Sequence, residues 1–180
     1  MIIRKSKVLQ DVYYSRRNAA QDMKGTRLLS YSWTTFLGVS ITDVYETIYR
    51  KEIHQAQEFH GLFYYPKQSF LFRCFRGKAQ LLAADLRSNS VSFLKCEKVS
   101  LTSDGENQTY LPIGFAWGIL SEEKNTAIQI HTTKSNGSEI VMVDPFGGQF
   151  DFDWGSEEFS VAKYNLPLKK IEDFGEHCSE

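Results

Sequence analysis

The sequence predicts an all-β protein that forms one antiparallel sandwich or barrel. Among its 180 residues are 13 Phe, nine Tyr and three Trp, and 42% of the residues are hydrophobic, which is enough to fill one core. Short runs rich in aromatic and β-branched residues alternate with turn residues at the spacing typical of antiparallel sheets. We therefore expect a single domain over residues 1–180 with only a few short helices.

The strand pattern appears in runs bounded by turn formers such as Gly, Asn, Asp and Ser. We predict strands at 69–75, 79–86, 92–101, 108–112, 116–120, 126–132 and 139–143, with turns at 76–77, 88–90, 103–105, 122–125 and 135–137. Short helices are predicted at 33–37 or 43–49 and at 168–174, and a flexible polar tail at 175–180.

Charge and cysteine content exclude several classes of protein. With 21 basic and 22 acidic residues the formal charge is -1, so no overall field attracts nucleic acid or an anionic membrane. No apolar run has the length of a signal peptide core or a membrane span, and we expect a cytoplasmic protein. Cys74, Cys96 and Cys178 are odd in number and lack CxxC spacing, which predicts reduced thiols rather than disulfides or a zinc site.

Several motifs resemble one family in their sequence and their order. The segment 111–118, LPIGFAWG, resembles the Ile-Pro-x-Gly-Phe-Ala-His-Gly motif of the dTDP-4-dehydrorhamnose 3,5-epimerase family. Residues 72–87 are similar to that family's Val-Arg, Gly and Val-Asp-Leu-Arg run at the same spacing. Further similar segments lie at 24–25, 60–64, 131–133, 144–145 and 150–154, so the resemblance covers residues 22–154.

The resemblance implies a cupin fold, which is a double-stranded β-helix or jelly-roll barrel. It also implies a homodimer that binds a sugar nucleotide, a 4-keto-6-deoxy sugar linked to dTDP. In the family the N-terminal segment reaches the partner subunit's pocket, and Lys24 would contact substrate from that segment.

The family's catalytic groups are mostly replaced in this sequence. Epimerisation beside a ketone needs a base for the α-proton, donors for the enolate oxygen and an acid on the other sugar face. In the family these groups are His backed by Asp, together with Lys and Tyr. Phe63 stands at the His position and Phe70 at the Lys position, and 134–136 supplies no Tyr. Only Asp144 matches, so we do not expect the ordinary 3,5-epimerase reaction.

The other polar candidates are a replacement base, His131, a binding residue, His60, and the matched aspartate, Asp144, each with a structural alternative. Strand alternation puts Gln129 and His131 on one face, so His131 could serve as a base beside Gln129, or it could be a structural or surface histidine. His60 could bind a phosphate or sugar where the family has Arg, or lie at the surface. Asp144 could be catalytic or could cap a turn.

The remaining candidates would bind substrate. Trp117, at a histidine position of the family, could stack on a sugar or base ring, or could simply fill the barrel. Phe63, Phe70 and Trp117 together would make the pocket more apolar than that of the family. Arg73 could bind phosphate, or form an ion pair across the sheet. The four histidines are not clustered as metal ligands, so we predict no metal and no other cofactor.

Three functions remain open from the sequence. The first is a divergent sugar-nucleotide cupin that binds an activated 4-keto-deoxy sugar as a non-standard epimerase or isomerase in deoxysugar or surface-polysaccharide biosynthesis. The second is a non-catalytic carbohydrate-binding or interaction protein of the same family. The third is a structural dimer whose pocket is filled by Phe63, Phe70 and Trp117.

Overall fold

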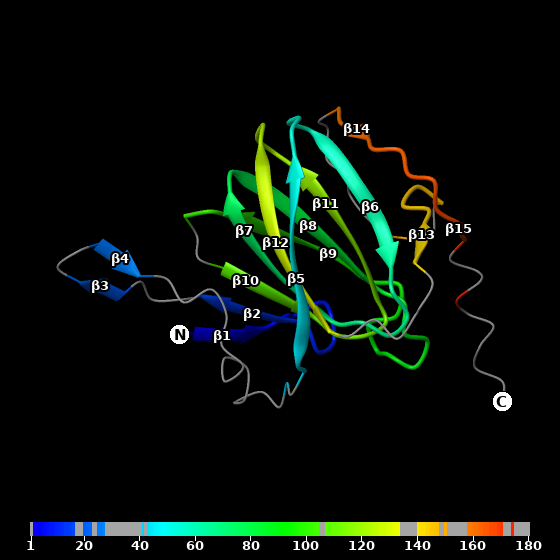
Figure 1. Ribbon diagram of the computed structural model, residues 1–180. Helices are drawn as coiled ribbons and strands as arrows, with labels where there is room; N and C mark the ends of the chain where they lie inside the picture. Colours follow the sequence, from blue (N-terminus) through cyan, green and yellow to red (C-terminus); the bar gives the residue numbers. More distant parts are fainter. Residues whose placement is uncertain are drawn as a thin grey trace.

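The computed structural model of the chain is a sandwich of two large β-sheets (Figure 1). It describes residues 2–16, 20–22, 25–27, 41, 43–104, 107–133, 140–147, 150, 158–170 and 174. One sheet has six strands in the order β1 (Ile2–Lys5), β2 (Tyr13–Arg16), β10 (Asn107–Leu111), β7 (Phe70–Arg76), β12 (Thr126–Thr133) and β5 (Tyr45–Ile53).

The second sheet has seven strands and faces the first across the core. Its order is β15 (Leu168–Lys169), β13 (Val141–Val143), β6 (Glu58–Tyr64), β11 (Phe115–Ser121), β8 (Lys78–Asp85) and β9 (Cys96–Thr102), with β14 (Ser160–Val161) paired to β6. A separate two-stranded sheet contains β3 (Ala20–Asp22) and β4 (Gly25–Arg27).

The predicted all-β class is confirmed, and the predicted strands correspond to β7 through β13. The helix predicted at 43–49 is wrong, because this segment enters β5, which pairs along its length with β12. The helix predicted at 168–174 is wrong at its start, where β15 pairs with β13. The predicted segments 33–37 and 175–180 lie outside the described residues. Cys74 and Cys96 are free thiols, and Cys178 also lies outside the described part.

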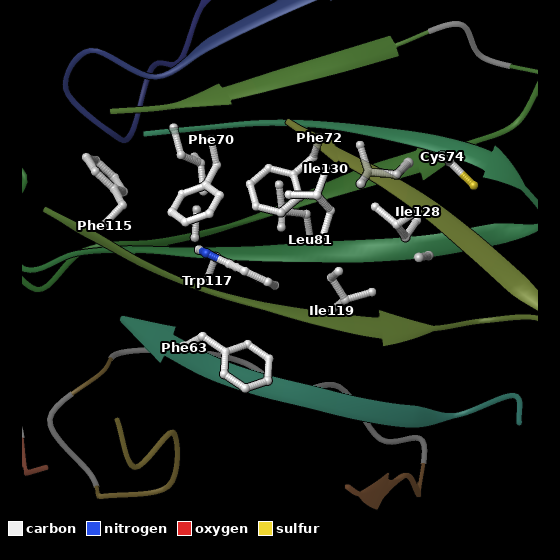
Figure 2. Close-up of a cluster of buried hydrophobic side chains, with 14 of the residues drawn as sticks. Phe63, Phe70, Phe72, Cys74, Leu81, Phe115, Trp117, Ile119, Ile128 and Ile130 are labelled. Atoms are coloured by element: carbon white, nitrogen blue, oxygen red, sulfur yellow. The ribbon is translucent and has the colours of Figure 1, made fainter. Parts of the chain in front are cut away.

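The main core lies between the two sheets and is rich in aromatic rings (Figure 2). Alternation along β7 and β12 directs one set of side chains inward, and β6, β8 and β11 supply the facing set. The inward set includes Phe63, Phe70, Phe72, Cys74, Leu81, Phe115, Trp117, Ile119, Ile128 and Ile130. Burial of each large apolar side chain in such a core contributes about 1.5–3 kcal/mol.

A register shift between β6 and β11 places both His60 and Phe63 on the inner face, although they are three residues apart. His60 lies opposite Ile119, and Phe63 lies opposite Trp117, with a shift between these pairs. Simple alternation would put residues 60 and 63 on opposite faces, and a bulge removes this conflict. Gly61 occupies the shift with a φ of 132°, and a Cβ there would lie 2.7 Å from the Cα of Gly118. The close approach of β6 and β11 therefore requires glycine at this position.

No helix among the described residues has the length and apolar character needed to span a bilayer.

Candidate functional site at the mouth of the barrel

Four aromatic residues fill the centre of the barrel, and we call them the interior aromatic cluster: Phe63, Phe70, Phe72 and Trp117. The Trp117 ring lies 5.1 Å from that of Phe63, 5.5 Å from that of Phe70 and 5.0 Å from that of Phe72, between ring centroids. All four side chains are buried. Because Phe63 and Phe70 carry no group that transfers protons, the positions at which the resemblance expects the catalytic His and Lys provide only apolar surface.

Polar side chains gather beside this cluster, where β5, the edge strand of the six-stranded sheet, approaches β6 of the second sheet. Tyr49 and Lys51 lie on β5 opposite the inward residues Ile130 and Ile128 of β12, and therefore point toward the core face. We call the following set the polar rim: Tyr49, Lys51, Glu58, His60, Tyr65 and Tyr164.

Tyr164 reaches the rim from a C-terminal segment, 158–170, which we call the strap. The strap begins with β14, parallel to β6, and ends with β15, parallel to β13 (Figure 1, orange). Tyr164 and Leu166 between these strands pack against the main core. The Tyr164 ring lies 5.0 Å from that of Phe63 and its hydroxyl contacts Lys51, so the strap connects β5 with β6.

The rim contains a continuous chain of polar contacts. Lys51 Nζ donates to the Tyr164 hydroxyl at 2.9 Å, and that hydroxyl is hydrogen-bonded to His60 Nδ1. His60 Nε2 lies 3.1 Å from a carboxylate oxygen of Glu58. Since Lys51 can only donate, the Tyr164 hydroxyl accepts from it and donates to Nδ1. The imidazole proton then lies on Nε2, facing Glu58.

The surroundings of the rim favour neutral His60 and protonated Tyr164. Burial lowers the pKa of His60, the charge of Lys51 lowers it further, and Glu58 opposes the shift. Burial also lowers the pKa of Lys51, against the attraction of Glu58. Burial, with Glu58 and Tyr65, raises the pKa of Tyr164 to about 12. The pKa of Tyr49 is raised by burial and by its contact with Tyr65.

We expect the lowered pKa of His60 to make folding stability depend on pH. Above pH 6.5, near the ordinary histidine pKa, both folded and unfolded states hold neutral imidazole. As the pH falls from there toward the lower folded pKa, the unfolded chain binds the proton first, and the free energy of unfolding decreases. Urea unfolding of the wild type between pH 7.5 and pH 5 should show this loss, and His60→Gln should show less of it. An equal slope in both proteins would contradict the assignment to His60.

Of the predicted site residues, the structure brings together His60, Phe63 and Trp117. It places Arg73, Gln129 and His131 on the other side of the six-stranded sheet, because β7 and β12 direct Phe72 and Ile130 into the core. His131 is buried there, with its ring edge-on to Tyr45 at 6.0 Å. Gln129 pairs in register with Arg73.

That outer face carries a shallow groove of its own. The groove has a volume of about 260 Å³ and is lined by Ile48, Arg50, Phe75 and Gln129 of the outer face, together with Tyr49 of the edge strand β5. It opens on the face away from the interior aromatic cluster, so the two predicted groups of site residues do not form a single pocket.

Asp144 follows the last residue of β13 and forms a turn. Its Oδ1 accepts a hydrogen bond of 2.9 Å from the backbone N–H of Phe146, which is the geometry of an Asx turn. Lys24 lies outside the described residues. Among the residues that the structure does describe, no three His, Cys, Asp or Glu side chains form a group suited to a metal ion.

Sequence reasoning missed Lys51, Glu58, Tyr49 and Tyr164. The first three lie on β5 and β6, whose strands were not predicted, although the chain from Tyr45 to Tyr64 is rich in aromatic and β-branched residues. Tyr164 is far from them in sequence, and its position depends on how the strap crosses from β6 to β13. Neither periodicity nor a motif indicates that path.

The chain is similar to known epimerases in sequence and in structure. A family model described as dTDP-4-dehydrorhamnose 3,5-epimerase matches residues 6–169. The dTDP-4-dehydrorhamnose 3,5-epimerase of Escherichia coli (strain K12) is 41% identical over 66 residues, which are 37% of this chain and 36% of that protein. The matched stretch thus spans about a third of the curated relative.

Two solved structures illustrate the structural similarity. The RmlC epimerase of Mycobacterium tuberculosis has a TM-score of 0.83 at 17% identity, covering 96% of this chain and 90% of that one. The dTDP-6-deoxy-D-glucose-3,5-epimerase RmlC of Legionella pneumophila Philadelphia 1, in complex with dTDP-4-keto-L-rhamnose, has a TM-score of 0.79 at 20% identity, covering 89% and 87%. At these identities the similarity establishes a shared fold, and the predicted cupin-type barrel is confirmed.

Proposed function

This chain belongs to the dTDP-4-dehydrorhamnose 3,5-epimerase family, and on that premise we propose that it binds a dTDP-linked 4-keto-deoxy sugar at the mouth of its barrel. We propose that it acts there as a non-standard epimerase or isomerase in deoxysugar or surface-polysaccharide biosynthesis. The Legionella relative is in complex with a ligand of this class, dTDP-4-keto-L-rhamnose. The family resemblance also supports a homodimer.

One observation supports this proposal most directly: the polar rim lies against the interior aromatic cluster. The Tyr164 ring lies 5.0 Å from that of Phe63, and Lys51 Nζ lies 5.7 Å from the centre of the Phe63 ring. Flat apolar rings suit the faces of a sugar or a base, and a cation with hydroxyl groups suits phosphate and carbonyl oxygens.

A buried donor inside the barrel gives further support. Trp117 is 2% exposed, and its indole N–H has no acceptor among the described residues. A buried N–H without a partner is costly, and a ligand oxygen would provide the missing acceptor.

A non-catalytic binding protein is the second candidate. It is supported by the same aromatic cluster, because Phe63 and Phe70 stand at positions where the family has catalytic side chains, and both rings pack on Trp117. This candidate also binds sugar nucleotide, but it leaves the sugar unchanged.

The binding proposal can be tested by calorimetric titration with dTDP and with dTDP-4-keto-6-deoxyglucose. We expect both to bind. Lys51→Ala should raise the dissociation constant of the keto sugar about tenfold, which corresponds to a loss of about 1.4 kcal/mol of binding free energy. The matched control is Lys78→Ala, because Lys78 is an exposed lysine at the start of β8, two strands away from β6, and forms an ion pair with Glu122 at 2.6 Å. If neither nucleotide binds the wild type, the proposed function is wrong.

A further inference from the structure

We propose that Tyr164 is the proton-transfer residue of this protein, and that His60, Glu58 and Lys51 position it and relay its proton. This assignment rests on the proposed function. It moves the reacting centre from residue 63, in the middle of the barrel, to Tyr164 on the strap, which contacts the polar rim.

The position of Tyr164 supports this role. Its ring packs on Phe63, with 5.0 Å between centroids, and its hydroxyl meets Lys51 and His60. Phe63 occupies the position at which the resemblance expects the catalytic histidine. Tyr164 therefore brings a hydroxyl directly beside the site of the lost imidazole.

The hydrogen bonds give Tyr164 a direction for proton transfer. Its hydroxyl accepts from Lys51 and donates to Nδ1 of His60, and Nε2 of His60 faces Glu58 at 3.1 Å. The hydroxyl oxygen keeps a second lone pair that can take a proton from outside the chain. When His60 takes the tyrosine proton it becomes a cation beside the Glu58 carboxylate, which favours that charge.

This arrangement permits enolisation without forming a phenolate. The C–H bond next to the sugar ketone breaks, its electron pair forms the C=C bond of an enolate, and the carbonyl oxygen gains the negative charge. The carbon's proton moves to the Tyr164 oxygen while the tyrosine's own proton moves to His60 Nδ1. Return of a proton from the Tyr164 oxygen to the carbon, while His60 returns a proton to Tyr164, restores the ketone. The ammonium group of Lys51 lies near enough to Tyr164 to favour the enolate charge.

The raised pKa of Tyr164 and the lowered pKa of His60 agree with a resting state in which Tyr164 is protonated and His60 is neutral. A tyrosine with a pKa of about 12 stays protonated at neutral pH, and a histidine with a lowered pKa stays neutral and able to accept. The charged and titratable groups that face His60 are Lys51 from β5, Glu58 from β6 and Tyr164 from the strap.

Other polar groups are less suited to this chemistry. Asp144 accepts a hydrogen bond from the backbone of its own turn. His131 and Gln129 lie on the outer face of the six-stranded sheet, away from Phe63.

The test is deuterium exchange into dTDP-4-keto-6-deoxyglucose at C3 and C5, followed by proton NMR in deuterated water. Wild type, Tyr164→Phe, His60→Gln and the control Tyr64→Phe are compared, with binding measured for each by calorimetry. Tyr64 follows Phe63 on β6, and its ring packs on Phe174 instead of the main core. We expect exchange in the wild type and in Tyr64→Phe. In Tyr164→Phe the exchange rate should fall about 100-fold or more, while the affinity for the keto sugar stays nearly unchanged.

The pH profile distinguishes a relay from a structural role for His60. The wild-type exchange rate should rise with pH as His60 loses its proton and then level off, and His60→Gln should lack this rise. If the wild type binds the keto sugar without exchange, or if Tyr164→Phe exchanges at the wild-type rate, the assignment is overturned and binding stands. If the wild type does not bind the sugar at all, the proposed function fails and the assignment fails with it.

Discussion

Trp117→Ala is expected to lower the free energy of unfolding by about 3–5 kcal/mol, the range measured for removing a large aromatic side chain from a packed core. Trp117 is 2% exposed and contacts Phe63, Phe70, Phe72 and Tyr65 through its ring. Its neighbours belong to both sheets (Figure 2), so the cavity left by alanine cannot close by moving one strand. Urea unfolding at pH 7 measures the loss.

Trp117→Phe is the matched control. It keeps an aromatic ring and removes only the N–H and part of the ring system, so we expect a loss of about 1–2 kcal/mol. The exposed Val91→Ala, at 83% exposure, should change stability by less than about 0.5 kcal/mol. A loss below about 1.5 kcal/mol in Trp117→Ala would mean that the barrel interior is not packed around this indole.

Trp117→Ala also tests whether Trp117 contacts a ligand or only fills the barrel. If a sugar or base ring stacks on Trp117, the alanine variant should bind the nucleotide sugar more weakly than the phenylalanine variant. If the indole only fills the barrel, the alanine variant should lose stability without a matching loss of affinity at temperatures where it stays folded.

The sequence was sufficient to predict the strands from β7 to β13. In these strands apolar residues such as Phe70, Phe72, Ile128 and Ile130 alternate with other residues, and Gly or Asn marks the turns. The alternation also placed Gln129 and His131 on one face, as observed. It could not place that face relative to a ligand, because on β7 and β12 the apolar side chains lie inside the barrel and Arg73, Gln129 and His131 lie outside.

β5 was missed because it is an edge strand with mixed faces. Its outer face carries the exposed Ile48, and its inner face carries Lys51, so apolar and polar residues do not separate by face. Such a segment can be read as a short helix. Strand alternation also could not predict that His60 lies on the same face as Phe63, because this depends on the register shift at Gly61.

Arg87→Ala is expected to cost about 3–5 kcal/mol at pH 7, because it leaves the carboxylate of Asp85 buried without its cation. The Asp85 side chain is 0% exposed, and Arg87 binds it through Nε and Nη2, each at 2.9 Å. Ser90 and Ser92 donate to the same carboxylate at 2.6 Å. Arg87 also contacts Asp11 at 3.1 Å and the carbonyl of Gln10 at 2.9 Å, which fixes the chain between β1 and β2.

The sign of the pH effect follows from Asp85. Burial alone would raise its pKa, but hydrogen bonds from Arg87, Ser90 and Ser92 outweigh this, and the net pKa is lowered. In the wild type, ionised Asp85 therefore contributes fully to the free energy of unfolding above a pH of about 4, the ordinary aspartate pKa. This contribution is lost as the pH falls through the lower pKa of the folded state. In Arg87→Ala the carboxyl can take up a proton, so the difference between wild type and variant should be larger at pH 7 than at pH 4.

Arg76→Ala is the matched control, because Arg76 is 53% exposed and its ion pair with Glu52 spans 3.9 Å. An exposed pair of this kind contributes less than about 1 kcal/mol and should show little change between the two pH values. Equal losses for Arg87→Ala at pH 7 and pH 4 would contradict the role of Asp85. The cost would then come from contacts that do not titrate in this range, such as the packing of Arg87 over the ring of Phe115 at 4.8 Å.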